Sequence, residues 1–499
     1  MNELSRPLRP LRSVALCHSP QWTFLILGML RELKRKYGTV IHIYVFSDQT
    51  IKFYAKHAEP GLIDSIQVCK LISDGAQRAF AGDRDALEAE ARRIEKRYGV
   101  TYNEIMMTDR HIGRGFSLLA PNFPRSLQSE AAGYEGILQK FNEDFAFWDN
   151  EFRSKRFDTM IFPQKIPGVV ARALGVPTRN LTRTRIGNLF HWSENGEFIE
   201  LPRLEARTAA VPPGQPPVEL KVYSQYETNR QIAIANFGRL QALRNVAHWT
   251  VKYALQRVSR RSAGYQWWST VRHYLDLPAQ WRELRRLRPG TLDDLKGSPF
   301  VFFAMQEEPE MSLSWQSPES WPQLAYLWQI ARDLPAGAKL AVKEHIYAVG
   351  RRPRGFYRHL MDFKNVVLLD PLLPGADVVR AAVAVATITS TAGFEAAWIG
   401  KPVISLSRHS LYNFLDHVRL PDVEPGGMRG VLADVFSGAM DLNKAREDGA
   451  RFHQALVDVS FDIGTYDMAN PSGFELERLE TLMTTFQASF EPGVELSRV

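Results

Sequence analysis

The sequence is poor in cysteine and lacks any long apolar run. Two cysteines, Cys17 and Cys69, occur in 499 residues, which argues against a disulfide framework and indicates a reducing compartment. We expect both to be buried in strands rather than to act as nucleophiles. No apolar run approaches the roughly 20 residues that span a bilayer. The first residues form a short Arg/Pro segment that does not have the pattern of a signal peptide.

Several motifs of phosphate and metal chemistry are also missing. No Gly-x-Gly-x-x-Gly follows the first expected strand, and no Gly-x-x-x-x-Gly-Lys-Ser/Thr occurs, which disfavours a dinucleotide-dependent enzyme and a P-loop ATPase or kinase. No His/Cys cluster has zinc-ligand spacing. Asp83-Arg84-Asp85 stands at an expected helix start, where acidic residues commonly cap, so capping is favoured over metal binding. We therefore expect neither a metal nor a cofactor.

Both halves of the chain alternate apolar strands with helices, and the length suits about two large domains. Strands this apolar indicate parallel sheets that helices cover on both faces. The expected strands of the first half are residues 14–17, 40–46, 65–71 and 158–162, with helices at 22–36 and 83–97. Those of the second half are residues 300–305, 339–342, 366–369, 384–388 and 403–406, with one helix opening at Ser317-Pro318.

Three polar segments follow expected strands of the second half. They are Gln306 to Glu310, Lys343-Glu344-His345, and Thr389 to Glu395. In open parallel sheets, ligands bind beyond the carboxyl ends of the strands. The sequence therefore predicts that these segments converge on a ligand.

The last of these segments has the pattern of a phosphate-accepting turn. At the start of a short helix, free backbone N–H groups and the helix dipole favour an anion, and Ser390 and Thr391 add hydroxyl donors. We expect Gly393 to allow close approach of the ligand and Glu395 to accept hydrogen bonds from a ribose diol. Lys343 supplies positive charge, and His345 is placed to bind phosphate or sugar, with a strand-end histidine bonded to the backbone as its alternative. A capped helix without any ligand is the alternative.

These motifs resemble those of the capsule polysaccharide biosynthesis proteins. The resemblance lies in Gln306 to Glu310, Val342 to His345, residues 365–369 and residues 389–403, with weaker matches at Thr108 to His111, 157–163 and 174–177. It implies an α/β fold of the GT-B type, in which two Rossmann-like domains face each other across a cleft. It also implies a nucleotide-sugar-dependent glycosyltransferase acting on capsule or lipopolysaccharide, with relatives that transfer Kdo from a CMP donor.

The expected domain organisation follows from a proline-rich run at residues 211–217, a stiff spacer that cannot join a helix or a central strand. An N-terminal acceptor domain is expected at 1–210, followed by the linker and a basic helical segment at 211–295. A nucleotide-sugar domain is expected at 296–455, and a last helix and tail at 456–499. The resemblance implies that this last helix returns to the first domain.

Glycosyl transfer needs a stabilised leaving phosphate and, for some acceptors, a base. The base candidates are Asp109, His18 after the first strand, and Glu310, which the resemblance suggests. Asp109 among basic neighbours also suits an orienting role, or a plain internal salt bridge. The expected acceptor contacts are Arg110, His111, Arg114, Arg183 and Arg185. A solvated loop is the alternative for the last two. The expected co-substrate is a nucleotide sugar, with CMP- and UDP-sugars considered first.

Residues 230–288 carry twelve Lys and Arg against two acidic residues, an excess larger than the net charge of +7 of the whole chain. Four of the 11 tryptophans lie here as well. On a helix, an apolar stripe would face the core, with Trp249, Tyr253 and Arg260 on the opposite side; the stripe comprises Leu240, Leu243, Ala247, Val251, Ala254 and Val258. Aromatics among arginines favour an anionic membrane surface. Nucleic acid or packing against the protein itself are the alternatives.

The sequence thus predicts a cytoplasmic enzyme that is peripheral on the inner face of the membrane, with a polymeric or lipid-linked glycan acceptor and no nucleic acid partner. Two other functions remain open. One is a sugar-nucleotide epimerase of the same fold, which needs no polymer acceptor. The other is a non-catalytic polysaccharide assembly factor.

Overall fold

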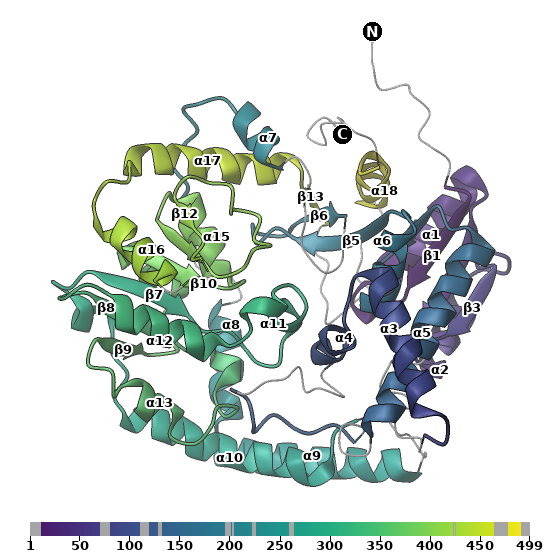
Figure 1. Ribbon diagram of the computed structural model, residues 1–499, viewed down its shortest axis with the longest axis horizontal. Coiled ribbons are helices and arrows are strands. Elements are labelled where there is room, and N and C mark those ends of the chain that lie inside the picture. The colour runs from purple at the N-terminus through teal and green to yellow at the C-terminus, as the bar shows by residue number, and fades with distance from the viewer. Residues whose placement is uncertain are drawn as a thin grey trace. The chain divides into compact units, whose positions relative to one another are not determined.

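The computed structural model describes residues 11–69, 80–109, 119–127, 132–194, 201, 204–221, 226–258, 264–422, 424, 426–463 and 478–490 (Figure 1). The chain forms two compact units, which we describe separately. The first comprises Met1–Ile105, Ala132–Leu204 and Ala455–Val499, and the second comprises Met106–Ala131 and Glu205–Gln454. The domain boundaries expected at residues 210, 295 and 455 stay a prediction.

A seven-stranded sheet forms the centre of the first unit, in the order β13-β6-β5-β4-β1-β2-β3. From β3 to β5 the strands are parallel, in the 3-2-1-4-5 order of a Rossmann-like sheet, whereas β6 and β13 are antiparallel to their neighbours. The strands are β1 (Ser13–Cys17), β2 (Val40–Val45), β3 (Ser65–Val68), β4 (Thr159–Ile161), β5 (Thr178–Arg183), β6 (Leu189–Ser193) and β13 (Phe461–Asp462).

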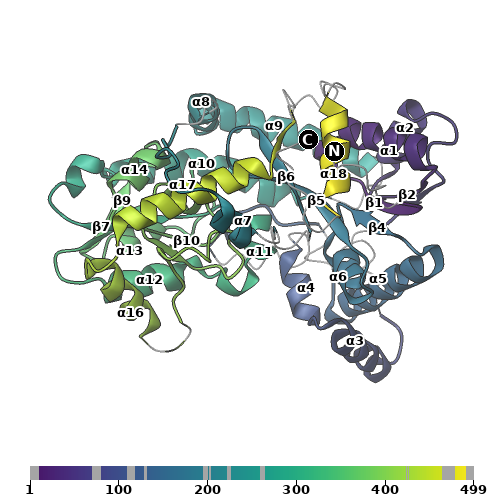
Figure 2. The same cartoon turned by 90° about the horizontal axis from the view of Figure 1, so that it is seen from above.

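Helices cover this sheet, and the last described helix returns to it (Figure 2). The helices are α1 (Thr23–Tyr37), α2 (Asp48–His57), α3 (Arg84–Tyr98), α4 (Tyr102–Thr108), α5 (Tyr134–Lys155), α6 (Lys165–Ala173) and α18 (Leu479–Ala488). Helix α18 contacts α1, where Leu479 lies against Gly28. The buried Arg179 of β5 donates to the Ser489 carbonyl oxygen at 2.7 Å. The expected return of the last helix is confirmed.

The second unit contains a six-stranded, wholly parallel sheet in the order β12-β11-β10-β7-β8-β9. Read from β9, this is the full 3-2-1-4-5-6 order of a doubly wound nucleotide-binding sheet. Its strands are apolar and almost fully buried, as expected when helices cover both faces. They are β7 (Phe300–Ala304), β8 (Lys339–Lys343), β9 (Val366–Leu369), β10 (Ala384–Thr387), β11 (Val403–Ser405) and β12 (Val418–Arg419).

The helices of the second unit include a long pair, α9 and α10, which precedes the sheet in the sequence. They are α7 (Leu204–Ala210), α8 (Tyr226–Asn236), α9 (Arg239–Val258), α10 (Trp267–Arg286), α11 (Met311–Ser314), α12 (Gln323–Asp333), α13 (Phe356–Leu360), α14 (Gly375–Ala381), α15 (Thr391–Trp398), α16 (Gly427–Phe436) and α17 (Leu442–Asp458). Two Rossmann-like sheets in one chain confirm the fold class that the sequence predicts.

Two local predictions also hold. Asp83 caps α3, because its carboxylate accepts from the backbone N–H of Asp85 at 2.9 Å and of Ala86 at 3.4 Å. Cys17 and Cys69 are free and buried as expected, although only Cys17 lies in a strand and Cys69 directly follows β3. Burial raises the pKa of both thiols, that of Cys69 to about 12, so both stay protonated at neutral pH. Among the described helices, none combines the length and the apolar character that crossing a bilayer requires.

The prediction of one helix start was wrong. Ser317-Pro318 was expected to open an α-helix, but Pro318–Ser320 forms a single 3₁₀ turn and α12 begins at Gln323. Ser317 is fully buried, and within the described ranges its hydroxyl makes no hydrogen bond. A second proline, Pro322, follows the 3₁₀ turn, has a non-helical ψ of 73° and carries no N–H to continue the hydrogen bonding, so α12 begins only after it.

The orientation expected for the 240–258 helix was wrong as well. The apolar stripe of α9 faces solvent, since Leu240 is 74% and Val251 is 60% exposed. Trp249, expected on the outer face, packs inward and donates to the Tyr274 hydroxyl of α10 at 2.9 Å. Aliphatic residues at helical spacing normally mark the core. Here the aromatic face buries against α10 and leaves the aliphatic face uncovered.

Candidate active site

The predicted convergence of polar segments is present at one edge of the second sheet. Strands β7 and β10 are neighbours, and the chain leaves them toward opposite sides of the sheet, which makes this the topological switch point. Gln306 follows β7 and Thr389 follows β10, and the Thr389 hydroxyl lies 2.9 Å from the Gln306 side-chain amide. Sequence segments more than 80 residues apart therefore meet where open α/β sheets bind their ligands.

At this turn, two of the expected free amides are already occupied. With its oxygen toward the turn, the Gln306 amide accepts from the N–H of Thr389 at 2.5 Å and of Ser390 at 2.9 Å. The Ser390 hydroxyl is 2.6 Å from that of Thr387, whose oxygen also accepts from the Ser390 N–H. The expectation of free N–H groups at the helix start is thus corrected at Ser390. In the described chain, Thr391 and Ala392 at the start of α15 make no N–H hydrogen bond.

The role expected for Gly393 also changes. A Cβ at this position would come within 2.2 Å of the Tyr412 hydroxyl and 2.6 Å of a Thr387 methyl group. The missing side chain therefore lets α15 pack against Tyr412 and β10, instead of opening a space for a ligand. Any contact of Gly393 with a nucleotide remains a prediction.

Two ionisable side chains, Lys343 and Glu395, lie at this edge of the second sheet. Lys343 ends β8, Glu395 lies in the second turn of α15, and both side chains are partly buried and close enough to influence each other's charge. Burial lowers the pKa of Lys343 to about 8, against the opposing effect of three carboxylates that include Glu395. Burial raises the pKa of Glu395 to about 7, against the effects of Arg380 and Lys343.

Neither the Lys343 ammonium nor the Glu395 carboxylate has a bonded partner among the described residues. No hydrogen bond or ion pair within the described ranges reaches the Lys343 ammonium or the Glu395 carboxylate. A desolvated charge without a partner is costly, and such groups cluster at functional sites. An ammonium and a carboxylate that are held apart beside a helix N-terminus can bind the phosphate and the sugar hydroxyls of one ligand.

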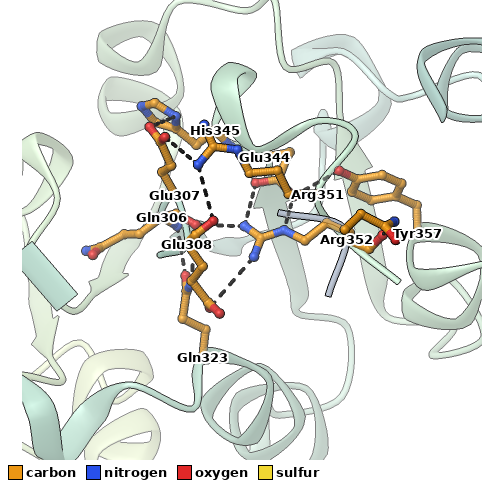
Figure 3. A network of polar contacts seen from close by, with 10 residues as sticks. Gln306, Glu307, Glu308, Gln323, Glu344, His345, Arg351, Arg352 and Tyr357 are labelled. Atoms are coloured by element: carbon orange, nitrogen blue, oxygen red, sulfur yellow. Dashed lines mark hydrogen bonds and ion pairs between the residues drawn. The ribbon is translucent and has the colours of Figure 1, made fainter. Parts of the chain in front are cut away.

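His345 stands at the exposed rim of the edge. Its side chain is 44% exposed, and its Nδ1 lies 3.8 Å from a Glu307 carboxylate oxygen. The other Glu307 oxygen pairs with Arg351 at 2.6 Å. Figure 3 shows His345, Glu307 and Arg351 together at one side of the polar network. His345 is therefore accessible to a ligand while its ring is oriented by a carboxylate.

Sequence reasoning missed the charge at the centre of this network. Arg352 is fully buried and binds Glu344 through two hydrogen bonds, from Nε at 2.7 Å and from one amino group at 2.8 Å (Figure 3). The Tyr357 hydroxyl donates to the same carboxylate at 3.0 Å. Glu344 is thus a structural residue within the predicted Lys-Glu-His triplet, which fixes the direction of its two neighbours.

The same arginine also reaches the segment after β7. Arg352 donates to the Gln306 carbonyl oxygen at 2.7 Å and lies 3.7 Å from the Glu308 carboxylate. Gln323 of α12 accepts from the Gln306 N–H at 2.8 Å and contacts Glu308. A sequence signal existed, since two buried acids after apolar strands require a counter-charge, but nothing local identified Arg352 as its source.

In the first unit, His18 occupies the equivalent switch point, directly after β1 and beside β4. It is 9% exposed, and its Nδ1 lies 3.0 Å from the Tyr54 hydroxyl. Burial lowers the pKa of His18 to about 4, so the imidazole is neutral at physiological pH, the form that a general base requires.

The remaining predicted residues are distributed over both units. Arg183 and Arg185 lie at the β5–β6 hairpin of the first unit, where Arg183 is exposed and donates to the Gly187 carbonyl oxygen at 3.3 Å. Asp109 follows α4 and Glu310 precedes α11, and both belong to the second unit. Arg110, His111 and Arg114 lie outside the described residues. Within the described chain, no group of three or more His, Cys, Asp or Glu side chains is arranged to hold a metal ion.

Two Rossmann-like sheets in one chain are the arrangement of the GT-B class of folds. Within that class, residues 209–415 match the family model described as capsule polysaccharide biosynthesis protein. The match includes β7, β8, β10 and α15, and therefore all the residues of the candidate edge. It confirms the resemblance inferred from the sequence motifs.

The solved structures that match this chain are distant from it in sequence. A glycosyltransferase from Rickettsia africae is 8% identical with a TM-score of 0.28, over 97% of this chain and 100% of that chain. UDP-GlcNAc 2-epimerase from Neisseria meningitidis is 11% identical with a TM-score of 0.26, over 95% and 100%. The β-Kdo 2,4 transferase KpsC from Thermosulfurimonas dismutans is 14% identical with a TM-score of 0.29, over 59% and 79%. The comparison with curated proteins gives no match.

Proposed function

We propose that the protein is a glycosyltransferase that moves a sugar from a nucleotide-sugar donor to a capsule or lipopolysaccharide acceptor. The observation that carries the proposal is the pair Lys343 and Glu395 beside the switch point of the second sheet: both are desolvated, and neither forms a hydrogen bond or an ion pair with the residues that the structure describes. The match of residues 209–415 to the capsule polysaccharide family supports the reaction class.

On the donor side, each residue has a separate task. Lys343 neutralises the leaving phosphate, and the N–H groups of Thr391 and Ala392 add donors at the start of α15. Glu395 accepts hydrogen bonds from the ribose diol, while His345 binds phosphate or sugar from the rim. Ser390 and Thr391 are proposed to contact the donor through their hydroxyl groups, and Gly393 only through its backbone. No metal is invoked, because an ammonium and a helix terminus can stabilise a phosphate leaving group on their own.

The acceptor side is proposed from the first unit and from the segment after α4. His18, neutral and held by Tyr54, is a candidate for the base that activates the acceptor hydroxyl. Asp109 and Glu310 are the other two candidates. Arg110, His111, Arg114, Arg183 and Arg185 are proposed contacts for an anionic glycan. We also propose that the enzyme works in the cytoplasm, on the membrane that carries a lipid-linked acceptor.

The test is a transfer assay with labelled CMP-, UDP-, GDP- and dTDP-sugars and capsule or lipopolysaccharide fragments as acceptors. We expect label in the acceptor with one donor, and a loss of at least about tenfold for Lys343→Met, because a charge-assisted hydrogen bond contributes about 1.5–3 kcal/mol. Lys339→Met, at the opposite end of β8, is the matched control.

Three results have distinct meanings in this assay. Free epimerised nucleotide sugar without transfer would replace the proposal by the epimerase. Absence of turnover, together with no rise in melting temperature for any nucleotide sugar, would indicate a non-catalytic assembly factor, since a ligand that binds the folded state must stabilise it. Equal transfer by the Lys343 variant and by wild type would refute the proposed site.

A further inference from the structure

One helix of the second unit exposes a continuous aliphatic face. In α9, Leu240, Leu243, Val251 and Leu255 are 57–74% exposed. They recur at helical spacing, so they share one side of the 20-residue helix, together with the exposed Ala247 and Ala254. Scattered exposed leucines are normal, but a whole helical stripe of them marks an interaction surface. We call this stripe the aliphatic face.

The direction of this face is fixed by packing on the other side of the helix. Helix α9 lies along α10 (Figure 1). Trp249 donates to the Tyr274 hydroxyl at 2.9 Å, and Trp267 of α10 donates to the Thr250 hydroxyl at 2.8 Å. Trp249 lies on the face opposite the leucines, and Thr250 lies on its flank. Rotating the aliphatic face inward would break both hydrogen bonds and expose two tryptophans.

The charge of α9 indicates what covers the aliphatic face. The helix contains four Lys and Arg residues and no Asp or Glu. All four are exposed: Arg239, Arg244, Lys252 and Arg257. None of the ion pairs among the described residues involves them. An aliphatic strip bordered by uncompensated positive charge is complementary to a surface that is apolar inside and anionic outside.

Two other partners for the aliphatic face, a second copy of α9 and nucleic acid, fit less well. A second copy of α9 would bring four positive charges against four more, with no acidic residue to offset them. Nucleic acid binds basic helices through aromatic side chains that stack on bases, whereas here the exposed residues are aliphatic and Trp249 is turned inward. An anionic lipid surface satisfies both the aliphatic face and the charge.

We propose that α9 is the membrane-docking element of this protein and lies in the plane of an anionic lipid surface. Leu240, Leu243, Val251 and Leu255 enter the acyl boundary, and the four basic residues contact lipid phosphates. This inference rests on the proposed work at a membrane and names the surface that performs it. That surface is the opposite side of the helix from the aromatic one that the sequence suggested.

The experiment uses the full chain in a vesicle flotation assay, with no donor and no acceptor present. We expect binding to vesicles of phosphatidylcholine with phosphatidylglycerol, weakened by salt, and binding at least about tenfold weaker to phosphatidylcholine alone. Leu243→Glu/Val251→Glu changes two exposed positions and should reduce binding at least about tenfold. The matched control Trp328→Glu/Leu442→Glu changes two residues that are 50% and 46% exposed elsewhere in the unit, and should bind as wild type does.

Lipid binding can fail while the proposed transfer reaction stands, because a soluble glycan fragment replaces the lipid-linked acceptor in the transfer assay. Equal flotation of the Leu243/Val251 variant and wild type would overturn the docking proposal. So would absence of flotation with the anionic vesicles. A dimer in gel filtration that the same variant dissociates, or RNA binding that it abolishes, would assign the aliphatic face to a second copy or to nucleic acid instead.

Discussion

At the residue scale, the candidate site depends on two side chains whose charges are held away from their ordinary pKa values. Burial acts on both, but in opposite directions on the pH scale, because it disfavours the charged form of an acid and of a base alike. Lys343 loses its proton near pH 8 and Glu395 gains one near pH 7. The two groups are therefore charged together only in a narrow range.

This range gives a prediction for donor binding. Below about pH 7 Glu395 is protonated and accepts sugar hydroxyls poorly, and above about pH 8 Lys343 is neutral and no longer attracts phosphate. Affinity should be greatest between these values and fall by up to about tenfold per pH unit on either side. Isothermal titration calorimetry from pH 5.5 to about 9.5 measures it, with a phosphodiester donor whose own charge is constant over this range.

The variant Glu395→Gln distinguishes the acid limb of this pH profile, below about pH 7, from its alkaline limb, above about pH 8. The amide keeps an acceptor oxygen but does not titrate, so the acid limb should flatten while the alkaline limb remains. An unchanged acid limb in this variant would show that another group titrates there, and would remove Glu395 from the site.

Sequence reasoning located Lys343, Glu395 and Thr389 because each follows an apolar strand, and strand ends in parallel sheets converge. It could not find Arg352, whose position depends on a turn of the chain between β8 and α13 that no local pattern specifies. It also assigned Gly393 to the ligand, whereas the neighbouring atoms belong to Tyr412 and Thr387. Contacts between distant segments decide both cases.

At the element scale, α15 is held in place by a close crossing with α17. The Cα of Gly449 faces the end of α15, and a Cβ there would lie 2.3 Å from the Ala397 carbonyl oxygen and 2.7 Å from that of Trp398. Backbone contacts this close cannot be relieved by a side-chain rotation. The crossing fixes the end of the helix whose start forms the proposed phosphate site.

Gly449→Ala should therefore destabilise the protein by about 1–3 kcal/mol, the usual cost of overpacking a tight contact. Gly430→Ala in α16 is the matched control, because nothing lies within 4 Å of its Cβ position. In a helix the control should be neutral or stabilise by about 0.5–1 kcal/mol. Urea denaturation followed by circular dichroism measures both variants; equal stability of the two would contradict the close crossing.

The spacing of apolar residues predicts which elements form, but it does not always predict which face of a helix is buried. The strands were predictable because a parallel sheet demands continuous apolar runs. The spacing of apolar residues in α9 correctly indicated a helix, but it could not indicate which side is buried. Aromatic residues form the contact between α9 and α10, because Trp249 and Trp267 bury more area than aliphatic residues and also find hydrogen-bond partners there.

At the scale of the whole molecule, the two sheets share the strand order that places a switch point beside the central strand. In the first unit this point holds the neutral His18, and in the second it holds the charged Lys343 and Glu395. In the proposed function, His18 is a candidate for proton transfer and Lys343 binds the phosphate of the donor.

The central claim is that the switch point of the second unit binds the nucleotide sugar. The most direct measurement is calorimetric titration of wild type, Lys343→Met and Lys339→Met with CMP-, UDP-, GDP- and dTDP-sugars at about pH 7.5. We predict saturable binding of one donor class by wild type and the Lys339 variant, and at least about tenfold weaker binding by the folded Lys343 variant. Identical affinities in all three proteins, or no binding of any donor to wild type, would contradict the account.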